Sequence, residues 1–181
     1  FDVQVLPAWR PDKAMNVEKP TFPAYMARLS EVSGIQVTDF ASLKKALQVR
    51  MDFFTSMGCC VSDHALEYVM YVPSTEAEVD AILAKGLKGE AVSKEEELKF
   101  KTAFMQFVAK QYHKRDWVMQ IHYGCRRDNN TPYYKRLGPD TGYDCIDNYA
   151  PSAQTAAFLD SINATEELPK TILYSLNPND N

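Results

Sequence analysis

The sequence predicts an α/β protein built on parallel strands, and three observations support this. Short apolar segments that suit buried strands alternate with longer segments whose apolar residues recur at helical spacing. Strands that are separated by helices pair in parallel. Polar and titratable residues follow the apolar segments directly, as they do at the ligand-binding face of such sheets. Part of a (β/α)8 barrel and an open doubly wound sheet both fit this order.

Four strands are expected, in the order β, α, α, β, α, α, β, α, β. They are expected at residues 3–6, 59–61, 117–121 and 172–176. Pro7 and Pro11 argue against a helix after the first strand, so the polar residues around Arg10 are expected on a loop. The polar run Ser62-Asp63-His64 likewise follows the second strand directly.

Capping residues define the expected helices. Thr75-x-x-Glu78 and Ser93-x-x-Glu96 have the pattern of capping boxes, and the second of them starts the longest helix. Glycines suit the ends of the first two helices because they adopt the left-handed conformation readily. The expected helix starts lie at Thr21, after Thr38, and at Thr75, Ser93 and Ser152, and the first two helices end at Gly34 and Gly58.

Composition narrows the class of protein. A chain of 181 residues can form one domain with a substantial core. Its net charge of −4 gives no reason to expect nucleic acid or an anionic membrane as a partner, and no apolar run is long enough to cross a bilayer. The cysteines at 59, 60, 125 and 145 form no Cys-x-x-Cys, so we expect reduced thiols and a cytoplasmic protein. Both ends look cut from something longer.

His122 is the sharpest candidate for a functional residue, because it ends an apolar strand and is followed by Gly124. The alternative is a histidine hydrogen-bonded within the core. Asp63 and His64 could form an acid/base or metal site, and a structural pair is about as well supported. His113, near a helix end, is expected at the surface.

Arginines near strand ends in an acidic chain favour an anionic small molecule, since guanidinium binds carboxylate in a bidentate way. These are Arg10, Arg126 and Arg127, and structural salt bridges are the alternative for each. The chain has no His-x-His, no His-Glu-x-x-His and no cysteine pair at ligand spacing, so metal binding by its own residues is weakly supported. It has no glycine-rich phosphate loop and no signature of a nucleophilic cysteine.

Five motifs in the right order resemble the uronate (glucuronate) isomerase family of the amidohydrolase superfamily. They read Leu-Pro-Ala-Trp-Arg-Pro-Asp-Lys-Ala at 6–14, Gly-Cys-Cys-Val-Ser-Asp-His-Ala-Leu at 58–66, Trp-Val-Met-Gln-Ile-His-Tyr-Gly-Cys-Arg-Arg-Asp-Asn-Asn at 117–130, Leu-Gly-Pro-Asp-Thr-Gly-Tyr-Asp at 137–144, and Leu-Pro-Lys-Thr-Ile-Leu-Tyr with Asn-Pro-Asn-Asp-Asn at 168–181. The departures are Tyr123 for isoleucine, Cys125 for alanine and Asp128 for the first asparagine.

The resemblance implies a (β/α)8 barrel of the TIM type with extra helices between its parallel strands. Residues 1–181 would be the central portion of that single domain, incomplete at both ends, with the first and last strands missing. The implied activity is the aldose–ketose isomerisation of hexuronates in bacterial uronate catabolism, D-glucuronate to D-fructuronate and D-galacturonate to D-tagaturonate. The alternatives are another metal-dependent hydrolase on the same barrel and a non-catalytic fragment.

The resemblance also implies roles for residues. Arg10 would bind the substrate carboxylate, and His122 would be the catalytic residue and line the pocket. Arg127, Asn129 and Asn130 would bind substrate or order the loop over it, and Asp63 and His64 are weaker candidates. A divalent metal, zinc by expectation, would be held by residues outside this chain, which by itself is expected to be inactive. We also expect a homo-oligomer.

Overall fold

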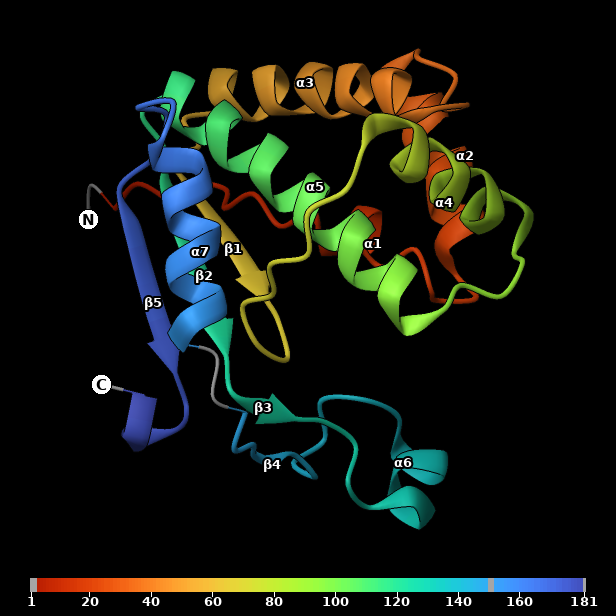
Figure 1. Cartoon of the computed structure of the whole chain (residues 1–181), viewed down its shortest axis with the longest axis vertical. Helices are drawn as coiled ribbons and strands as arrows, with labels where there is room; N and C mark the ends of the chain where they lie inside the picture. The colour runs from red at the N-terminus through yellow and green to blue at the C-terminus, as the bar shows by residue number, and fades with distance from the viewer. Residues whose placement is uncertain (1–2, 150–151, 181) are drawn as a thin grey trace.

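Three parallel strands form the centre of the computed structural model, which describes residues 3–149 and 152–180. In spatial order they are β1 (Val61–Ala65), β2 (Val118–Tyr123) and β5 (Thr171–Ser175), which lie side by side in Figure 1. In the register, Ala65 lies opposite His122, and His122 lies opposite Tyr174. The α/β class with a parallel sheet is therefore confirmed. Phe1 and Asn181, which open the first apolar segment and close the last motif, lie outside the described residues.

The chain joins the free edge of β1 at Trp9 and not at residues 3–6. Trp9 forms a parallel bridge with Ser62: its N–H donates to the Val61 carbonyl at 3.0 Å, and its carbonyl accepts from the Asp63 N–H at 2.8 Å. The predicted buried strand at 3–6 is wrong, since Val3 and Val5 are 74% and 90% exposed and unpaired with the sheet. Apolar composition alone does not make a strand where no neighbouring element covers it.

The other strands are confirmed with shifted ends. β1 includes the polar Ser62, Asp63 and His64, which were expected after the strand. They belong to it because pairing with β2 continues as far as Ala65. In the same way, β2 carries His122 within the sheet. Strand ends depend on the partner strand, which the local sequence does not reveal.

Two of the predicted capping signals are confirmed, whereas the side chain of Thr21, expected to cap α2, makes no cap hydrogen bond. Capping boxes are present at Thr75 with Glu78 and at Ser93 with Glu96. A third joins Asp39 and Ser42, so Asp39 caps the helix that was expected after Thr38. The helices are α1 (Asp12–Met15), α2 (Phe22–Ser33), α3 (Phe40–Ser56), α4 (Glu76–Lys88), α5 (Lys94–Lys114), α6 (Thr131–Leu137) and α7 (Ser152–Asn163), with a 3-10 turn at Pro178–Asp180.

Two short helices were not predicted. The expectation of a loop throughout the segment after Arg10 is wrong, because α1 begins at Asp12 directly after Pro11. Proline is tolerated at the start of a helix, where its missing N–H would have no helical partner anyway. Helix α6 begins after Asn130, whose side chain accepts from the Tyr133 N–H at 3.3 Å. Among the described residues, no helix is both long and apolar enough to cross a membrane.

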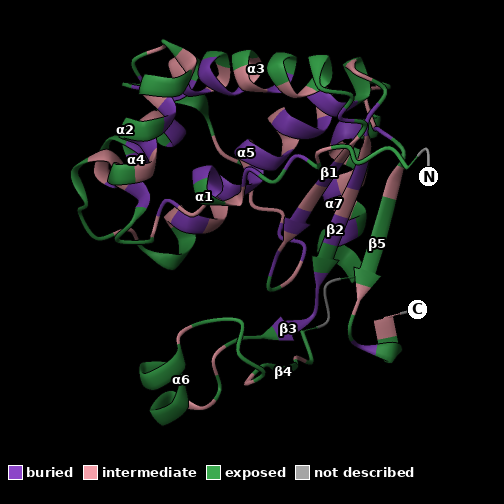
Figure 2. Ribbon diagram, turned by 180° about the vertical axis from the view of Figure 1, so that it is seen from behind, coloured by how far each residue is buried: buried purple, intermediate pink, exposed green. Residues whose placement is uncertain are grey.

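The two faces of the sheet differ in what covers them. Side chains alternate along a strand, so neighbours in β1 and β2 face opposite sides. One side is buried around helix α5 and carries Ser62, His64, Met119 and Ile121. The other side, with Asp63, Gln120, His122 and Tyr174, is half-buried or exposed. Figure 2 shows the buried colour concentrated around α5 and on the strands beside it, whereas β5 is largely exposed.

Residues 124–149 leave the sheet as an excursion that projects away from the core (Figures 1 and 2). It contains the antiparallel pair β3 (Cys125–Arg126) and β4 (Cys145–Ile146), and α6, in which no residue is buried. Gly124 starts it with a φ of +83°, and a Cβ there would lie 3.4 Å from the Leu176 nitrogen. Only glycine adopts this conformation readily, so Gly124 lets the chain turn beside the end of β5.

Candidate functional site

An open cavity of about 920 Å³ lies at the carboxyl ends of β1, β2 and β5. This is the edge at which parallel α/β proteins bind ligands. Its polar lining comes from Arg10, which follows Trp9 in the chain, from the three strands, and from the excursion at residues 124–149. The polar and aromatic residues that line it include Arg10, Asp63, His122, Arg127, Asp144, Tyr174 and Asp180.

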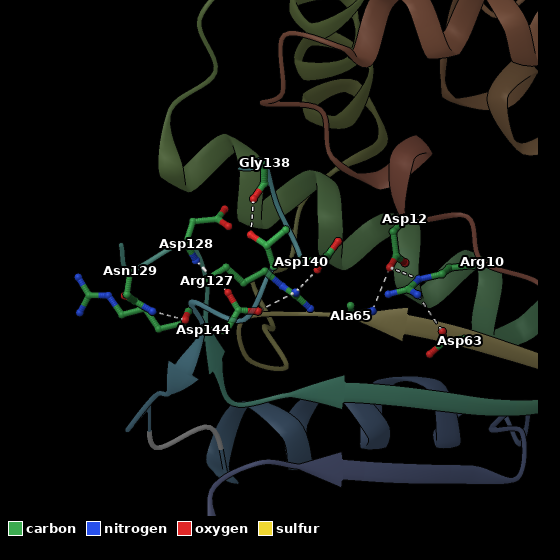
Figure 3. A network of polar contacts seen from close by, with 12 residues as sticks. Arg10, Asp12, Asp63, Ala65, Arg127, Asp128, Asn129, Gly138, Asp140 and Asp144 are labelled. Atoms are coloured by element: carbon green, nitrogen blue, oxygen red, sulfur yellow. Dashed lines mark hydrogen bonds and ion pairs between the residues drawn. The ribbon is translucent and has the colours of Figure 1, made fainter. Parts of the chain in front are cut away.

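Arg10 stands at this edge between two carboxylates (Figure 3). Its Nε lies 3.6 Å from Asp12 Oδ2, and its Nη1 lies 3.3 Å from Asp63 Oδ2. Both distances exceed the roughly 2.8 Å of a charge-assisted hydrogen bond. The Arg10 side chain, 56% exposed, therefore lies between two charges while its guanidinium donors remain available to an incoming anion.

His122 is held from two sides on the open face. Its Nδ1 lies 2.8 Å from Asp63 Oδ1, and its ring stacks on Tyr174 with centroids 4.4 Å apart and planes at 6°. The Tyr174 hydroxyl in turn donates to Gln120 Oε1 at 2.7 Å. Asp63 thus connects Arg10 with His122, and the three side chains share one edge of the cavity, as the positions of Arg10 and His122 at strand ends predicted.

Asp63 and His64 do not meet as an acid/base or metal pair, and His64 follows the structural alternative. As neighbours in β1 they face opposite sides of the sheet. His64 is fully buried on the helix side, where its Nδ1 lies 2.9 Å from Asp12 Oδ1 and its Nε2 lies 2.9 Å from the Tyr112 hydroxyl. The acid partner of His64 is therefore Asp12, 52 positions earlier in the chain.

Arg127 lines the cavity, yet its charge is already paired within the excursion. Its Nη1 contacts Asp140 at 2.9 Å and Asp144 at 3.2 Å, and Asp144 also accepts from the Asp128 N–H at 2.9 Å (Figure 3). Asp128 has a φ of +60°, a conformation that Asp and Asn adopt more readily than most residues, so the substitution seen here preserves the turn. These contacts give Arg127 a role in ordering the loop.

Asn129 and Asn130 are likewise used by the loop itself. The Asn129 side chain donates to the Arg126 carbonyl, and Asn130 caps helix α6. Neither lies in the lining of the cavity described above. Their contacts support loop ordering, and direct binding of substrate by Arg127, Asn129 and Asn130 stays a prediction.

Sequence reasoning did not single out three residues that shape the site: Asp12, Asp144 and Tyr174. Asp12 was visible as a polar residue after Arg10, but its histidine partner is distant in sequence. Tyr174 reads as one more apolar residue of a strand, and only the register that places it beside His122 reveals its use. A motif match locates such residues, whereas their contacts require the fold.

The metal was expected to be bound by residues outside this chain. Across residues 3–149 and 152–180, no group of three or more His, Cys, Asp or Glu side chains is arranged to hold a metal ion. Asp63, the carboxylate nearest the site's histidine, is engaged by Arg10 and His122.

Comparison with known families settles the membership of the chain. The model of a family described as glucuronate isomerase matches residues 1–181. This chain belongs to the glucuronate isomerase family. The resemblance of the five motifs is therefore confirmed. Two curated relatives, both uronate isomerases, match the whole chain: that of Lachnospira eligens is 66% identical and that of Endomicrobium trichonymphae is 60% identical over 181 residues.

Solved structures of family members have the same fold over this region. A crystal structure of uronate isomerase from Thermotoga maritima is 31% identical, with a TM-score of 0.90, over 96% of this chain and 38% of that one. Glucuronate isomerase from Caulobacter crescentus gives 27% identity and a TM-score of 0.83, over 96% of this chain and 36% of that one. The chain spans 39% of the length of the curated relatives that it matches.

Proposed function

We propose that the full-length protein isomerises hexuronates between aldose and ketose, converting D-glucuronate to D-fructuronate and D-galacturonate to D-tagaturonate in bacterial uronate catabolism. Family membership and the names of the relatives support this. The observation that carries it for this chain is Arg10 beside His122 at an open cavity, because the pair offers a cation for the carboxylate and an imidazole for the sugar.

We also propose that residues 1–181 are the central portion of one (β/α)8 barrel whose first and last strands lie outside this chain. In an open doubly wound sheet, helices cover both faces, whereas in a barrel they cover only the outer one. Burial around α5 on one side of β1 and β2, with half-exposed side chains on the other, supports the barrel. The open side would then face the barrel interior.

In the proposed chemistry Arg10 binds the uronate carboxylate through its guanidinium donors. Asp12 and Asp63 lie on either side of it. His122, oriented by Asp63 and Tyr174, presents Nε2, which has no partner among the described residues, to the sugar hydroxyls. There it holds or moves a proton while hydrogen passes between C2 and C1 of the sugar.

Three further expectations belong to the whole protein. A divalent metal, zinc in our proposal, would be bound by residues outside this chain and would polarise the sugar oxygens. We propose a cytoplasmic enzyme because Cys59, Cys60, Cys125 and Cys145 are free thiols. A homo-oligomer remains our expectation for its assembly.

The test is an assay of the full-length protein with D-glucuronate in the presence of zinc or manganese. Formation of the ketose, followed by NMR, is the expected result. The neutral hexose D-glucose is the matched substrate control, because it lacks the carboxylate that Arg10 would bind. Equal turnover of both sugars would contradict the role of Arg10, whereas hydrolysis of esters or amides without isomerisation would identify a different enzyme of the same barrel class.

A further inference from the structure

A buried hydrogen-bonded chain runs behind Arg10 from helix α5 to the edge of the sheet. It begins at the Tyr112 hydroxyl, 2.9 Å from His64 Nε2, and continues from His64 Nδ1 to Asp12 Oδ1, also 2.9 Å away. Tyr112 and His64 are both fully buried. Asp12 ends the chain: its Oδ2 accepts from the Ala65 N–H at 2.9 Å and lies 3.6 Å from Arg10 Nε (Figure 3).

The chemistry of Tyr112, His64 and Asp12 determines which group donates and which accepts in each hydrogen bond. An ionised carboxylate only accepts hydrogen bonds, so His64 donates from Nδ1 to Asp12. The Nε2 of a neutral imidazole then accepts, and Tyr112 donates its hydroxyl proton. Burial, and secondly the charge of Asp12, raise the pKa of Tyr112 well above its usual range, which keeps that proton in place. This assignment of the tautomer follows from the network and satisfies both ring nitrogens of the buried histidine.

We propose that Asp12, fixed by His64 and Tyr112, is the positioning residue that sets the orientation of the Arg10 guanidinium for the hexuronate carboxylate. The inference rests on the proposed carboxylate-binding role of Arg10. The proposed effect of Asp12 is limited to Arg10. Asp63 contacts both Arg10 and His122, whereas Asp12 contacts Arg10 and not His122. Asp12 therefore acts on substrate binding and leaves the orientation of His122 to Asp63.

Because the hydrogen-bonded series Tyr112–His64–Asp12 is largely buried, it can restrict the motion of the exposed Arg10 side chain. Arg10 is 56% exposed and would otherwise sample several rotamers, while the side chain of Asp12 is only 14% exposed. Asp12 is held at both oxygens, by His64 and by the Ala65 N–H. A rigid anion beside a mobile cation fixes the cation before the substrate arrives, and such preorganisation improves binding without changing the chemical step.

The decisive variant is Tyr112→Phe in the full-length protein. It removes one hydroxyl, at the end of the hydrogen-bonded series that lies farthest from Arg10. We expect the KM for D-glucuronate to rise about tenfold, as the loss of one buried hydrogen bond allows, while kcat stays within about twofold. Tyr71→Phe is the matched control, because the Tyr71 side chain is half-buried and its hydroxyl has no hydrogen-bond partner among the described residues. The control is expected to leave both constants unchanged.

A second comparison separates positioning from a general loss of folding. If Asp12 acts through Arg10, Asp12→Asn raises KM in the wild-type background but adds nothing in the Arg10→Met background. Equal fold-changes in the two backgrounds would overturn the proposal. Melting temperatures of all variants show whether any has simply unfolded, and a variant that melts below the assay temperature is replaced by His64→Gln, which keeps a hydrogen-bonding side chain.

A measurement without substrate keeps this inference distinct from the proposed function. The order parameter of the Arg10 Nε–H bond, measured by NMR relaxation, is expected to be lower in Tyr112→Phe than in Tyr71→Phe. An unchanged order parameter overturns the positioning role even in an active enzyme. A lower order parameter in a protein that does not isomerise uronates upholds the positioning role and overturns the proposed function.

Discussion

At the scale of single residues, the site depends on which side chains share a carboxylate. Asp63 contacts Arg10 at 3.3 Å and His122 at 2.8 Å, so one anion lies against both the cation and the imidazole. Tyr174 adds a flat surface under the His122 ring. The geometry of the cavity edge therefore comes from three strands and the segment that precedes α1, none of which forms the site alone.

Replacement of Tyr174 tests whether the stacked ring matters. Tyr174→Ala in the full-length protein is expected to lower kcat/KM for D-glucuronate up to about tenfold, because a stacked aromatic pair contributes about 0.5–1.5 kcal/mol. Tyr174→Phe keeps the ring, loses only the hydroxyl bond to Gln120, and is expected to stay within about threefold of wild type. Steady-state kinetics of the two variants decide the matter: equal losses would assign the effect to the hydroxyl instead of the ring.

At the scale of elements, the long helices that carry the core are defined by their N-termini. Helices α4 and α5 both start with capping boxes, in which the side chain of a glutamate returns to the N-cap N–H. Lys99 on α5 also bonds to Glu78 of α4, and Lys85 on α4 bonds to Glu96 of α5. The same glutamates therefore cap their own helix and link it to its neighbour.

These glutamates predict a loss of stability in acid. The Thr75 N–H and then Lys99 lower the pKa of Glu78 to about 2, and Lys85 and then the Ser93 N–H lower that of Glu96 to about 2, against an ordinary value of 4.5. Because the folded state has the lower pKa, the stabilisation is present above about pH 4.5 and disappears as the pH falls toward 2.

Urea unfolding at a series of pH values measures this effect. The double variant Glu78→Gln and Glu96→Gln is expected to show a flatter decline in the free energy of unfolding between pH 4.5 and 2 than wild type does. Glu90→Gln is the matched control, at a half-exposed glutamate that lies 3.8 Å from Lys88 and caps no helix. A decline as steep in the double variant as in the control would show that other carboxylates govern acid unfolding.

At the scale of the whole molecule, one face of the sheet is buried by helices and the other face is exposed. Around α5 the core is complete, with Phe100, Phe104 and Val108 fully buried. On β5, by contrast, Ile172, Leu173 and Tyr174 are 40–43% exposed. Exposed apolar side chains that lie together mark surfaces that other protein covers. This agrees with the proposal that further strands of a barrel complete the sheet.

The 181 residues expressed alone are therefore expected to associate and to lack isomerase activity. Association follows from the exposed apolar residues and the unpaired edge of β5. Light scattering after size exclusion measures it, and Ile172→Lys with Leu173→Lys is expected to reduce it. A monomeric 181-residue chain that turns over D-glucuronate would contradict both the exposed-surface argument and the incomplete barrel.

The sequence by itself determined the helices with capping boxes, the α/β class and, through its five motifs, the family. These features depend on local hydrogen bonding, periodicity and residue order, which can be read from residues close together in the sequence. Arg10 and His122 were found in the same way, as polar residues after apolar segments.

Only the tertiary structure decided which of these residues work together. Alternation within β1 separates Asp63 from its neighbour His64, and packing of α5 and α1 gives His64 the partners Tyr112 and Asp12. The failure of the strand at 3–6 has the same origin, since a strand needs a partner and a cover. Contacts between residues 50 positions apart depend on register and packing, which no local pattern encodes.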